Sequence, residues 1–283
     1  MSSQFWSYIR RNPLLLVGVS LFVLLFLFWA IGPTFIDVTK ARPISAMADL
    51  APSAEYPLGT DSVGRQLLPN LLAGSLYTFE IGLAAGTIGL LVGTILGFVA
   101  GYFGGTVDSI ISTAADVALT IPALAVLVVI AAVIKEGLNV RSMALIVAML
   151  AWMRPARTIR AQVLSMRERP YVEIARLSGM NDFQIIVQEL LPNLLPYLAA
   201  SYVGAVAAAL LAAIGLEAMG LGPQNDPTLG MTIFWCNYYG ALLRGMWWWW
   251  APPIAAILYV FMGLFAISSG LDELSNPRLR RAR

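Results

Sequence analysis

The sequence predicts an all-α integral membrane protein with about six transmembrane helices. The chain is 59% hydrophobic and only 12% charged, whereas a soluble domain of this length would be roughly 25% charged. Lipid must therefore cover much of its surface. In addition, apolar runs close to the length of a membrane span recur along the 283 residues.

Six apolar runs mark the predicted spans. They are Leu14–Ile31, Leu76–Ala100, Ile110–Ile134, Ser142–Met153, Leu194–Leu216 and Trp248–Ser269. A helix needs about 20 residues to cross a bilayer, so we expect the short fourth run to borrow residues from its flanks. The first run resembles a signal peptide, but it is 18 residues long and no small-residue cleavage site follows it before Gly32-Pro33. We therefore expect an uncleaved anchor.

The distribution of basic residues predicts the orientation. Six spans place both termini on the same side, which then holds 12 of the basic residues against six on the other side. The positive-inside rule puts the richer side in the cytoplasm. We expect one transmembrane domain over 1–283, with a cytoplasmic N-terminus at 1–13, an external loop at 32–75, a cytoplasmic loop at 154–193 and a cytoplasmic tail at 271–283.

Missing residue types exclude several kinds of chemistry. The chain has no His, so it has no Ser-His-Asp triad and no HExxH zinc site. A phosphate-binding P-loop needs Lys followed by Ser or Thr, but Lys40 precedes Ala and Lys135 precedes Glu. We expect no catalytic residue, no metal site and no cofactor bound by this chain. The net charge of only +2 gives no reason to expect a nucleic-acid partner.

Small residues follow one face of the second predicted span. Glycines recur there at four-residue spacing, at Gly82 and Gly86 and then at Gly89, Gly93, Gly97, Gly101 and Gly105. Alanines do the same in the fifth span. Such a face lets another helix backbone approach closely. It suits packing within one subunit, a seam between subunits or the lining of a pore.

Acidic residues near the membrane are candidates for function, because a charge in hydrocarbon is costly. Asp116 lies before the kink expected at Pro122. Asp116 has either a pathway or gating role or a structural bond to a neighbouring helix, and Pro122 is a candidate for the same pathway or gating role. Glu217, at the end of the fifth span, is a second candidate for the pathway.

A short helix is predicted in the 154–193 loop. Pro170 opens it, and Glu173 lies in its first turn, where a carboxylate suits the helix dipole. Gly179 can end it in the left-handed conformation.

A second short helix is predicted directly after the first. Asn181 and Gln184 form a capping-box start, and Pro192 is expected to stop the helix. A compact helical hairpin with flanking arginines suits docking against a soluble protein. It equally suits binding to anionic lipid.

The same loop resembles the EAA loop of bacterial ABC importer permeases. The resemblance is carried by the run Glu173-Ile174-Ala175-Arg176-Leu177-Ser178-Gly179 and by Leu191-Pro192, with Ile174 in place of the first Ala. It implies a type I ABC importer permease fold, in which this loop inserts into a cleft on an ATPase subunit. The implied coupling residues are Glu173, Ala175, Arg176, Gly179, Leu191 and Pro192.

Further blocks resemble the peptide/opine/nickel permeases, specifically the second of their two paired permeases. The run Gly59-Thr60-Asp61-Ser62-Val63-Gly64-Arg65 is similar to their G-T-D-x-x-G-R signature, which places Gly59, Thr60, Asp61, Gly64 and Arg65 in a family motif. The other blocks are Gly101–Gly105 with Asp108, Gly220-Leu221-Gly222 and Asn276–Arg280. Together they run in the family's order over most of the chain.

The resemblance implies a permease subunit that moves a small solute, such as an oligopeptide, by alternating access. It implies a multi-pass protein of the bacterial cytoplasmic (inner) membrane, in contact with lipid. The implied partners are a second homologous permease, two ATP-binding cassette subunits and an extracytoplasmic solute-binding protein. ATP and Mg²⁺ would be bound and ATP hydrolysed on the partner subunits, and this chain would be non-catalytic.

The solute stays open at this point, because the sequence departs from the family on its external side. Thr113 stands where relatives carry an Arg, which weakens the case for a charged peptide end. Trp247 to Trp250 form a run of four. They suit an interfacial aromatic belt, but Trp247 and Trp248 also suit an outer vestibule that stacks on a short oligosaccharide. Alternatives of another class are an ion-coupled secondary transporter, with Asp116 as its only support, and a membrane scaffold.

Overall fold

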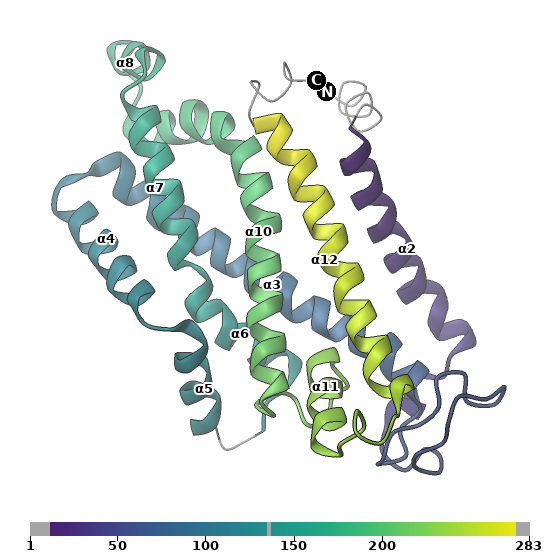
Figure 1. Cartoon of the computed structure of the whole chain (residues 1–283). Coiled ribbons are helices and arrows are strands. Elements are labelled where there is room, and N and C mark those ends of the chain that lie inside the picture. Colours follow the sequence, from purple (N-terminus) through teal and green to yellow (C-terminus); the bar gives the residue numbers. More distant parts are fainter. Residues whose placement is uncertain (1–11, 135–136, 276–283) are drawn as a thin grey trace.

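The computed structural model describes residues 12–134 and 137–275. This part of the chain is helical, and its only strand-like pairing is an isolated bridge between Thr60 and Gln66. Figure 1 shows the arrangement. The long helices are α2 (Pro13–Phe35), α3 (Leu67–Phe103), α10 (Leu191–Ala218) and α12 (Trp247–Ser275). The shorter ones are α4 (Gly105–Thr120), α5 (Ala123–Val133), α6 (Val140–Ala151), α7 (Met153–Arg167), α8 (Pro170–Leu177), α9 (Asp182–Gln184) and α11 (Leu229–Tyr238).

Five of the six predicted spans are found by length and composition. Four are the helices at Pro13–Phe35, Leu67–Phe103, Asp182–Ala218 and Trp247–Leu271, and the bent pair α4 and α5 makes a fifth. The remaining predicted span, α6, is a shorter apolar helix of 12 residues. The fold class predicted from the sequence is confirmed.

The third span is broken rather than merely kinked. The axes of α4 and α5 differ by 84°. The break lies at Ile121 and Pro122, where Ile121 leaves the helical region with φ −86° and ψ 131°. A proline ring disfavours the helical conformation of the residue before it, so Pro122 ends α4 at this point. The kink expected at Pro122 is therefore found as a full break between two helices.

The fourth span continues into the predicted loop. Trp152 keeps helical angles, with φ −79° and ψ −23°, so that α7 follows α6 after this single residue. The stretch from Met153 to Arg167 is therefore a helix that packs along α3, and the connection proper begins after it.

The glycine face of α3 packs within this one chain. A Cβ built on Gly86 would lie 2.7 Å from the Cα of Val206 in α10. One built on Gly97 would lie 2.9 Å from the carbonyl oxygen of Ala156 in α7. Backbone approaches this close leave no room for a side chain. Of the alternatives that the sequence left open, packing within the subunit is the one seen for these glycines.

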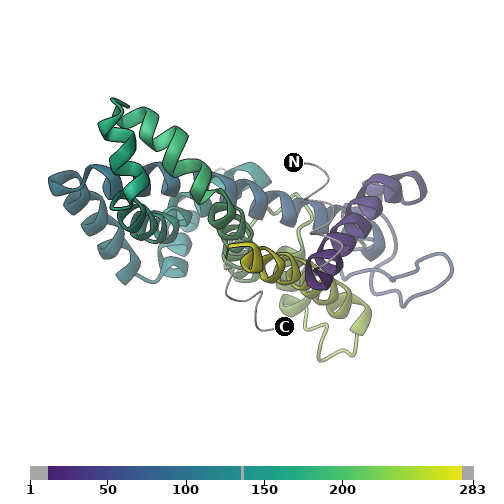
Figure 2. The same cartoon turned by 90° about the horizontal axis from the view of Figure 1, so that it is seen from above.

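The long helix α3 joins two groups of helices. Seen from above, α2 and α12 lie together on one side and α4 to α7 on the other (Figure 2). Because α3 contacts α6, α7 and α10 and also reaches α2 and α12, it crosses both groups. The first residues of α2 and the last turns of α12 point to the same end as α8 (Figure 1). We call this end the α8 end and the other the opposite end.

Candidate functional site

The α8 end carries the hairpin that the sequence predicts. Pro170 lies at the start of α8 and Glu173 in its first turn. The helix ends at Gly179, whose φ of +83° is left-handed. The N–H of Gly179 donates to Arg176 O at 3.0 Å and that of Met180 to Ala175 O at 3.2 Å. This pair of bonds is a Schellman ending, so the predicted boundaries of the helix are confirmed.

The second helix begins as predicted but does not end as predicted. Asn181 and Gln184 form a reciprocal capping box with two bonds of 2.9 Å. Pro192 does not stop the helix, because the chain runs on from α9 through a π-helical turn, η2 (Ile185–Leu190), into α10. In η2 the N–H of Leu191 donates to Ile186 O, five residues back. The wider turn makes room for the Pro192 ring, which in an α-helix would clash with the carbonyl four residues earlier.

The hairpin is anchored on one face and exposed on the other. Val172 and Ala175 are buried against the body of the protein. Outward, Ile174, Leu177 and Phe183 expose 63%, 82% and 75% of their surface. We call these three residues the α8 knob. Large apolar side chains that are exposed together are typical of a surface that binds another protein.

Polar contacts fix the hairpin to the end of α3. The hydroxyl of Tyr102 donates to Asp182 at 2.7 Å. The Arg176 guanidinium lies 5.7 Å from the centre of the Tyr102 ring, within reach of a cation–π contact. Movement of α8 is therefore tied to movement of α3, which packs against most of the other spans.

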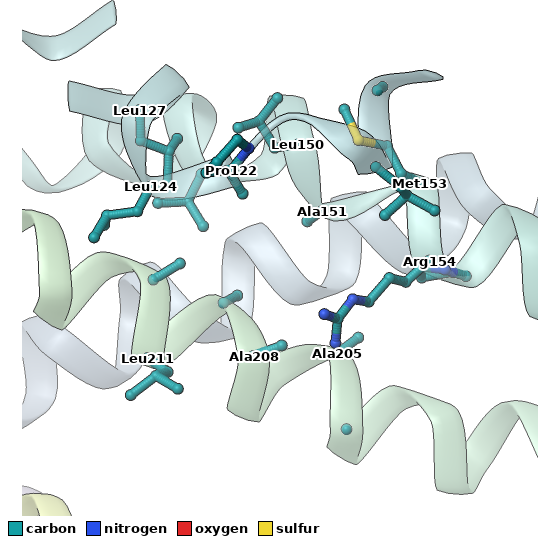
Figure 3. Close-up of a pocket in the computed structure, with 18 of the residues that line it drawn as sticks. Pro122, Leu124, Leu127, Leu150, Ala151, Met153, Arg154, Ala205, Ala208 and Leu211 are labelled. Atoms are coloured by element: carbon teal, nitrogen blue, oxygen red, sulfur yellow. The ribbon is translucent and has the colours of Figure 1, made fainter. Parts of the chain in front are cut away.

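A cavity of about 910 Å³ opens at the break between α4 and α5. It is bounded by both of these helices, by the junction of α6 and α7, and by α10. Pro122, predicted as a pathway residue, lines it (Figure 3). Most lining residues are apolar or small, including Leu124, Ala205 and Ala208. A cavity of this size, built around a broken helix, suits the passage or binding of a small solute.

The structure does not bring the predicted acidic residues to this cavity. Asp116 forms an ion pair with Arg157 at 3.3 Å, and both side chains are more than half exposed. This geometry agrees with the alternative of a bond to a neighbouring helix. Glu217 is fully buried in the last turn of α10, where Gly222 and Gly230 leave room for its side chain.

The tryptophan run does not line the cavity either. Trp249 is fully buried and Trp248 packs beside it, in a cluster with Leu67 and Cys236. Trp248 also covers Gly59. Trp247 is 54% exposed. The run therefore has residues on several sides of α12, as expected for consecutive positions of a helix.

The signature from Gly59 to Arg65 builds a loop at the opposite end. Gly59 and Gly64 have φ of +67° and +74°, which favours glycine. Thr60 is fully buried; its hydroxyl donates to Met47 O at 2.7 Å and accepts from Leu50 N at 2.9 Å. One oxygen of Asp61 accepts from the N–H groups of Val63 and Arg65, at 2.9 and 2.8 Å. The signature thus shapes the connection between α2 and α3.

That connection is also tied to the segment before α12. Arg244 donates to Asp49 at 2.6 Å and to Ser62 at 2.8 Å. The Arg244 guanidinium, followed by Ser62, holds the pKa of the Asp49 carboxyl below its usual value. Arg65 lies 5.9 Å from the centre of the Trp235 ring in α11. These contacts join residues that are far apart in the sequence.

Sequence reasoning missed three features. It placed Arg154 in a loop, whereas this residue lies near the start of α7 and lines the cavity. It did not predict α11, whose start is capped by the Thr228 side chain. It also did not predict the bidentate ion pair between Asp108 of α4 and Arg160 of α7. The periodicity of 153–167, with buried Ala156, Ile159 and Val163, was the signal for α7.

The spans, the broken third helix and the protruding hairpin define a membrane transport subunit, and the comparisons agree. A family model described as "Binding-protein-dependent transport system inner membrane component" matches residues 89–281. The chain belongs to this family. It is a permease subunit of an ABC importer and a multi-pass inner-membrane protein.

Relatives match along almost the whole chain. The dipeptide transport system permease protein DppC of Bacillus subtilis is 30% identical over 98% of this chain and 85% of its own length. The di/tripeptide transport system permease protein DppC of Pseudomonas aeruginosa is 29% identical over 99% of this chain and 93% of its own. A chain of the MetNI methionine ABC transporter, in inward facing conformations, covers 74% of this chain with TM-score 0.57 and 17% identity, a likeness of fold alone.

Proposed function

We propose that this chain is one of two unlike permeases of a bacterial importer of short peptides, and that α8 transmits the work of a partner ATPase to it. The proposal on the solute is supported by relatives named for dipeptides, di/tripeptides and oligopeptides, each of which matches at least 96% of this chain. The alternative of a short oligosaccharide rested on aromatic rings in an outer vestibule, among them Trp247 and Trp248, and these two residues do not line the cavity at the α4–α5 break.

The exposed α8 knob is the observation that carries the coupling proposal. Leu177 alone leaves 82% of its surface uncovered, on a helix whose other face is buried. A partner with an apolar cleft would cover it, and the cation–π and hydroxyl contacts of Tyr102 would pass the movement to α3. The α8 end then faces the cytoplasm, together with both termini. The ATPase subunits hydrolyse ATP, and this chain contributes no catalytic group.

The test uses the complete transporter, with both permeases, the ATPase subunits and the solute-binding protein, reconstituted in vesicles. Uptake of a labelled dipeptide and of a labelled disaccharide is measured with and without ATP. We expect ATP-dependent accumulation of the dipeptide only. Accumulation of the disaccharide but not the dipeptide would contradict the peptide proposal. ATP hydrolysis by this chain purified alone would contradict its non-catalytic role.

A further inference from the structure

The cavity at the α4–α5 break holds a single charged side chain. Of the residues that line it, all within the described part of the chain, only Arg154 is charged. Thr120, Thr158, Tyr197 and Ser201 add hydroxyl groups, and the rest of the lining is apolar or small. The arrangement of one cation and a few hydroxyls in an apolar cavity is typical of a site that orients a ligand.

Arg154 lies near the start of α7, beside the break between α4 and α5. It comes 14 residues after the start of α6 at Val140, and α7 continues α6 after one residue. At 1.5 Å per residue this is about 21 Å along the continuous α6–α7 helix, and the Arg154 side chain is exposed where it lines the cavity. A cation among apolar residues is costly unless it faces a water-filled cavity, and in membrane transport proteins such residues mark the paths of solutes.

Within the described part of the chain, no acidic side chain forms an ion pair with Arg154. Its neighbours along α7 are paired: Arg157 with Asp116, Arg160 with Asp108 and Arg167 with Glu168. Among the described residues, Arg154 has no ion-pair or side-chain hydrogen-bond partner. Figure 3 shows its side chain reaching from α7 toward Ala205 and Ala208 of α10. These two small residues leave the guanidinium free to meet a ligand.

We propose that Arg154 binds the terminal carboxylate of the peptide while it occupies this cavity. The inference rests on the proposed peptide function and names the group that is recognised. A guanidinium matches a carboxylate with two parallel hydrogen bonds. Thr158, one turn along α7, lies on the same face of the helix and lines the cavity beside Arg154, while its hydroxyl donates to the backbone oxygen of Arg154.

Recognition through the terminal carboxylate fits the rest of the cavity. Every unmodified linear peptide carries this group, whatever its side chains. The small and apolar lining then accommodates different side chains without demanding one of them. In the sequence, Thr113 stands where relatives carry an Arg, which weakened the case for a charged peptide end. In this site the positive charge comes from α7 instead, so Thr113 of α4 does not remove it.

The experiment uses the complete transporter in vesicles and two probes, labelled trialanine and its C-terminal amide. Uptake is measured for the wild type, Arg154→Gln, Arg154→Lys and the matched control Arg157→Gln. The ratio of acid to amide uptake is compared with that of the wild type, so that any preference of the solute-binding protein cancels. If the amide is not delivered at all, acid uptake by Arg154→Gln is compared with that by Arg157→Gln instead.

We expect Arg154→Gln to lower the ratio about tenfold, since a charge-assisted pair is lost. Arg154→Lys should keep the larger part of acid uptake, and Arg157→Gln should leave the ratio unchanged. If Arg154→Gln does not assemble, the neutral variant Arg154→Met takes its place in the same comparison. A ratio equal to that of the wild type overturns it while peptide transport stands. A wild type that takes up neither peptide overturns the proposed function and this assignment together.

Discussion

The two ends of the molecule differ in how their structure is determined. At the α8 end, the helices are set by neighbouring residues: Pro170 opens α8, Gly179 closes it and Asn181 caps the next helix. At the opposite end, the loop from 36 to 66 is held by distant partners, such as Arg244, which is 195 residues from Asp49. The first kind of structure can be read from a short motif, and the second cannot.

The difference also concerns what each end leaves exposed. The α8 hairpin is fixed to α3 by the contact of Tyr102 with Asp182, and it presents the large apolar side chains of the α8 knob outward. The connection at the opposite end uses its signature residues for internal bonds, and Thr60 and Asp61 are buried. We infer that the two family motifs have different roles. The motif at the α8 end shapes a docking element, and the signature from Gly59 to Arg65 shapes a loop.

The largest expected effect of a substitution is a loss of stability in the helix packing between the two ends. Gly97→Leu places a side chain where α7 backbone lies 2.9 Å away. We expect a destabilisation of about 3 kcal/mol from overpacking, and loss of the subunit from the membrane fraction. Thermal unfolding of the purified complex measures it. Gly204→Ala is the matched control, because nothing lies within 4 Å of the new Cβ. Equal stability of the two variants would contradict the packing of α3 against α7.

Variants of α8 should separate function from folding. Gly179 has φ +83°, whereas proline requires about −65°, so Gly179→Pro should disrupt the end of the hairpin. Glu173→Arg places the wrong charge in the first turn of α8. We expect both variants to insert normally and to abolish ATP-dependent uptake, with weaker binding of the ATPase subunits. Normal transport by both in vesicles would show that this hairpin is not the coupling element.

The sequence predicted structure well where local chemistry decides. The caps of α8 and α9 and the apolar spans belong to this class. It failed at Pro192, because a proline normally stops a helix and the π-helical turn η2 removes the clash. It also failed at Arg154, because a run of arginines suggested a solvated loop. The buried faces of Ala156 and Ile159 show that the run is one side of a packed helix.

The long-range contacts gave no local signal. The residues near Asp49 in the sequence do not predict its contact with Arg244. Those near Gly59 do not predict that Trp248 packs over it. Likewise, the cavity forms only when α4, α5, α7 and α10 come together. Each of its residues taken alone looks like an ordinary member of an apolar helix.

The smallest expected effect is on local stability at the opposite end, where Asp49 pairs with Arg244. The Asp49–Arg244 pair is partly exposed, so we expect it to contribute about 0.5 kcal/mol. Asp49→Asn should raise hydrogen exchange of the 36–66 segment about twofold at pH 7. Because the folded-state pKa of Asp49 is lowered, the contribution is present above the usual value of about 3.9 and is lost as pH falls through the folded-state value.

This pH dependence sharpens the comparison of the two ends. The difference between wild type and Asp49→Asn should shrink at low pH, once exchange is corrected for its intrinsic pH dependence. Exchange in α8 should not change with this substitution at any pH. A difference that persists below the folded-state pKa would mean that Asp49 acts by something other than its charge.

The central claim is that the α8 end faces the cytoplasm and docks an ATPase, whereas the opposite end does not. Labelling with a membrane-impermeant maleimide tests it directly, because the native Cys236 is buried. Ser178→Cys in the exposed α8 hairpin and Leu243→Cys, at a position that is 93% exposed at the opposite end, are the two probes. We predict that Ser178→Cys is labelled only from the cytoplasmic side and is protected when the ATPase subunits bind, whereas Leu243→Cys is labelled only from outside and is unaffected. Labelling of Ser178→Cys from outside, or no protection by the ATPase subunits, would contradict the account.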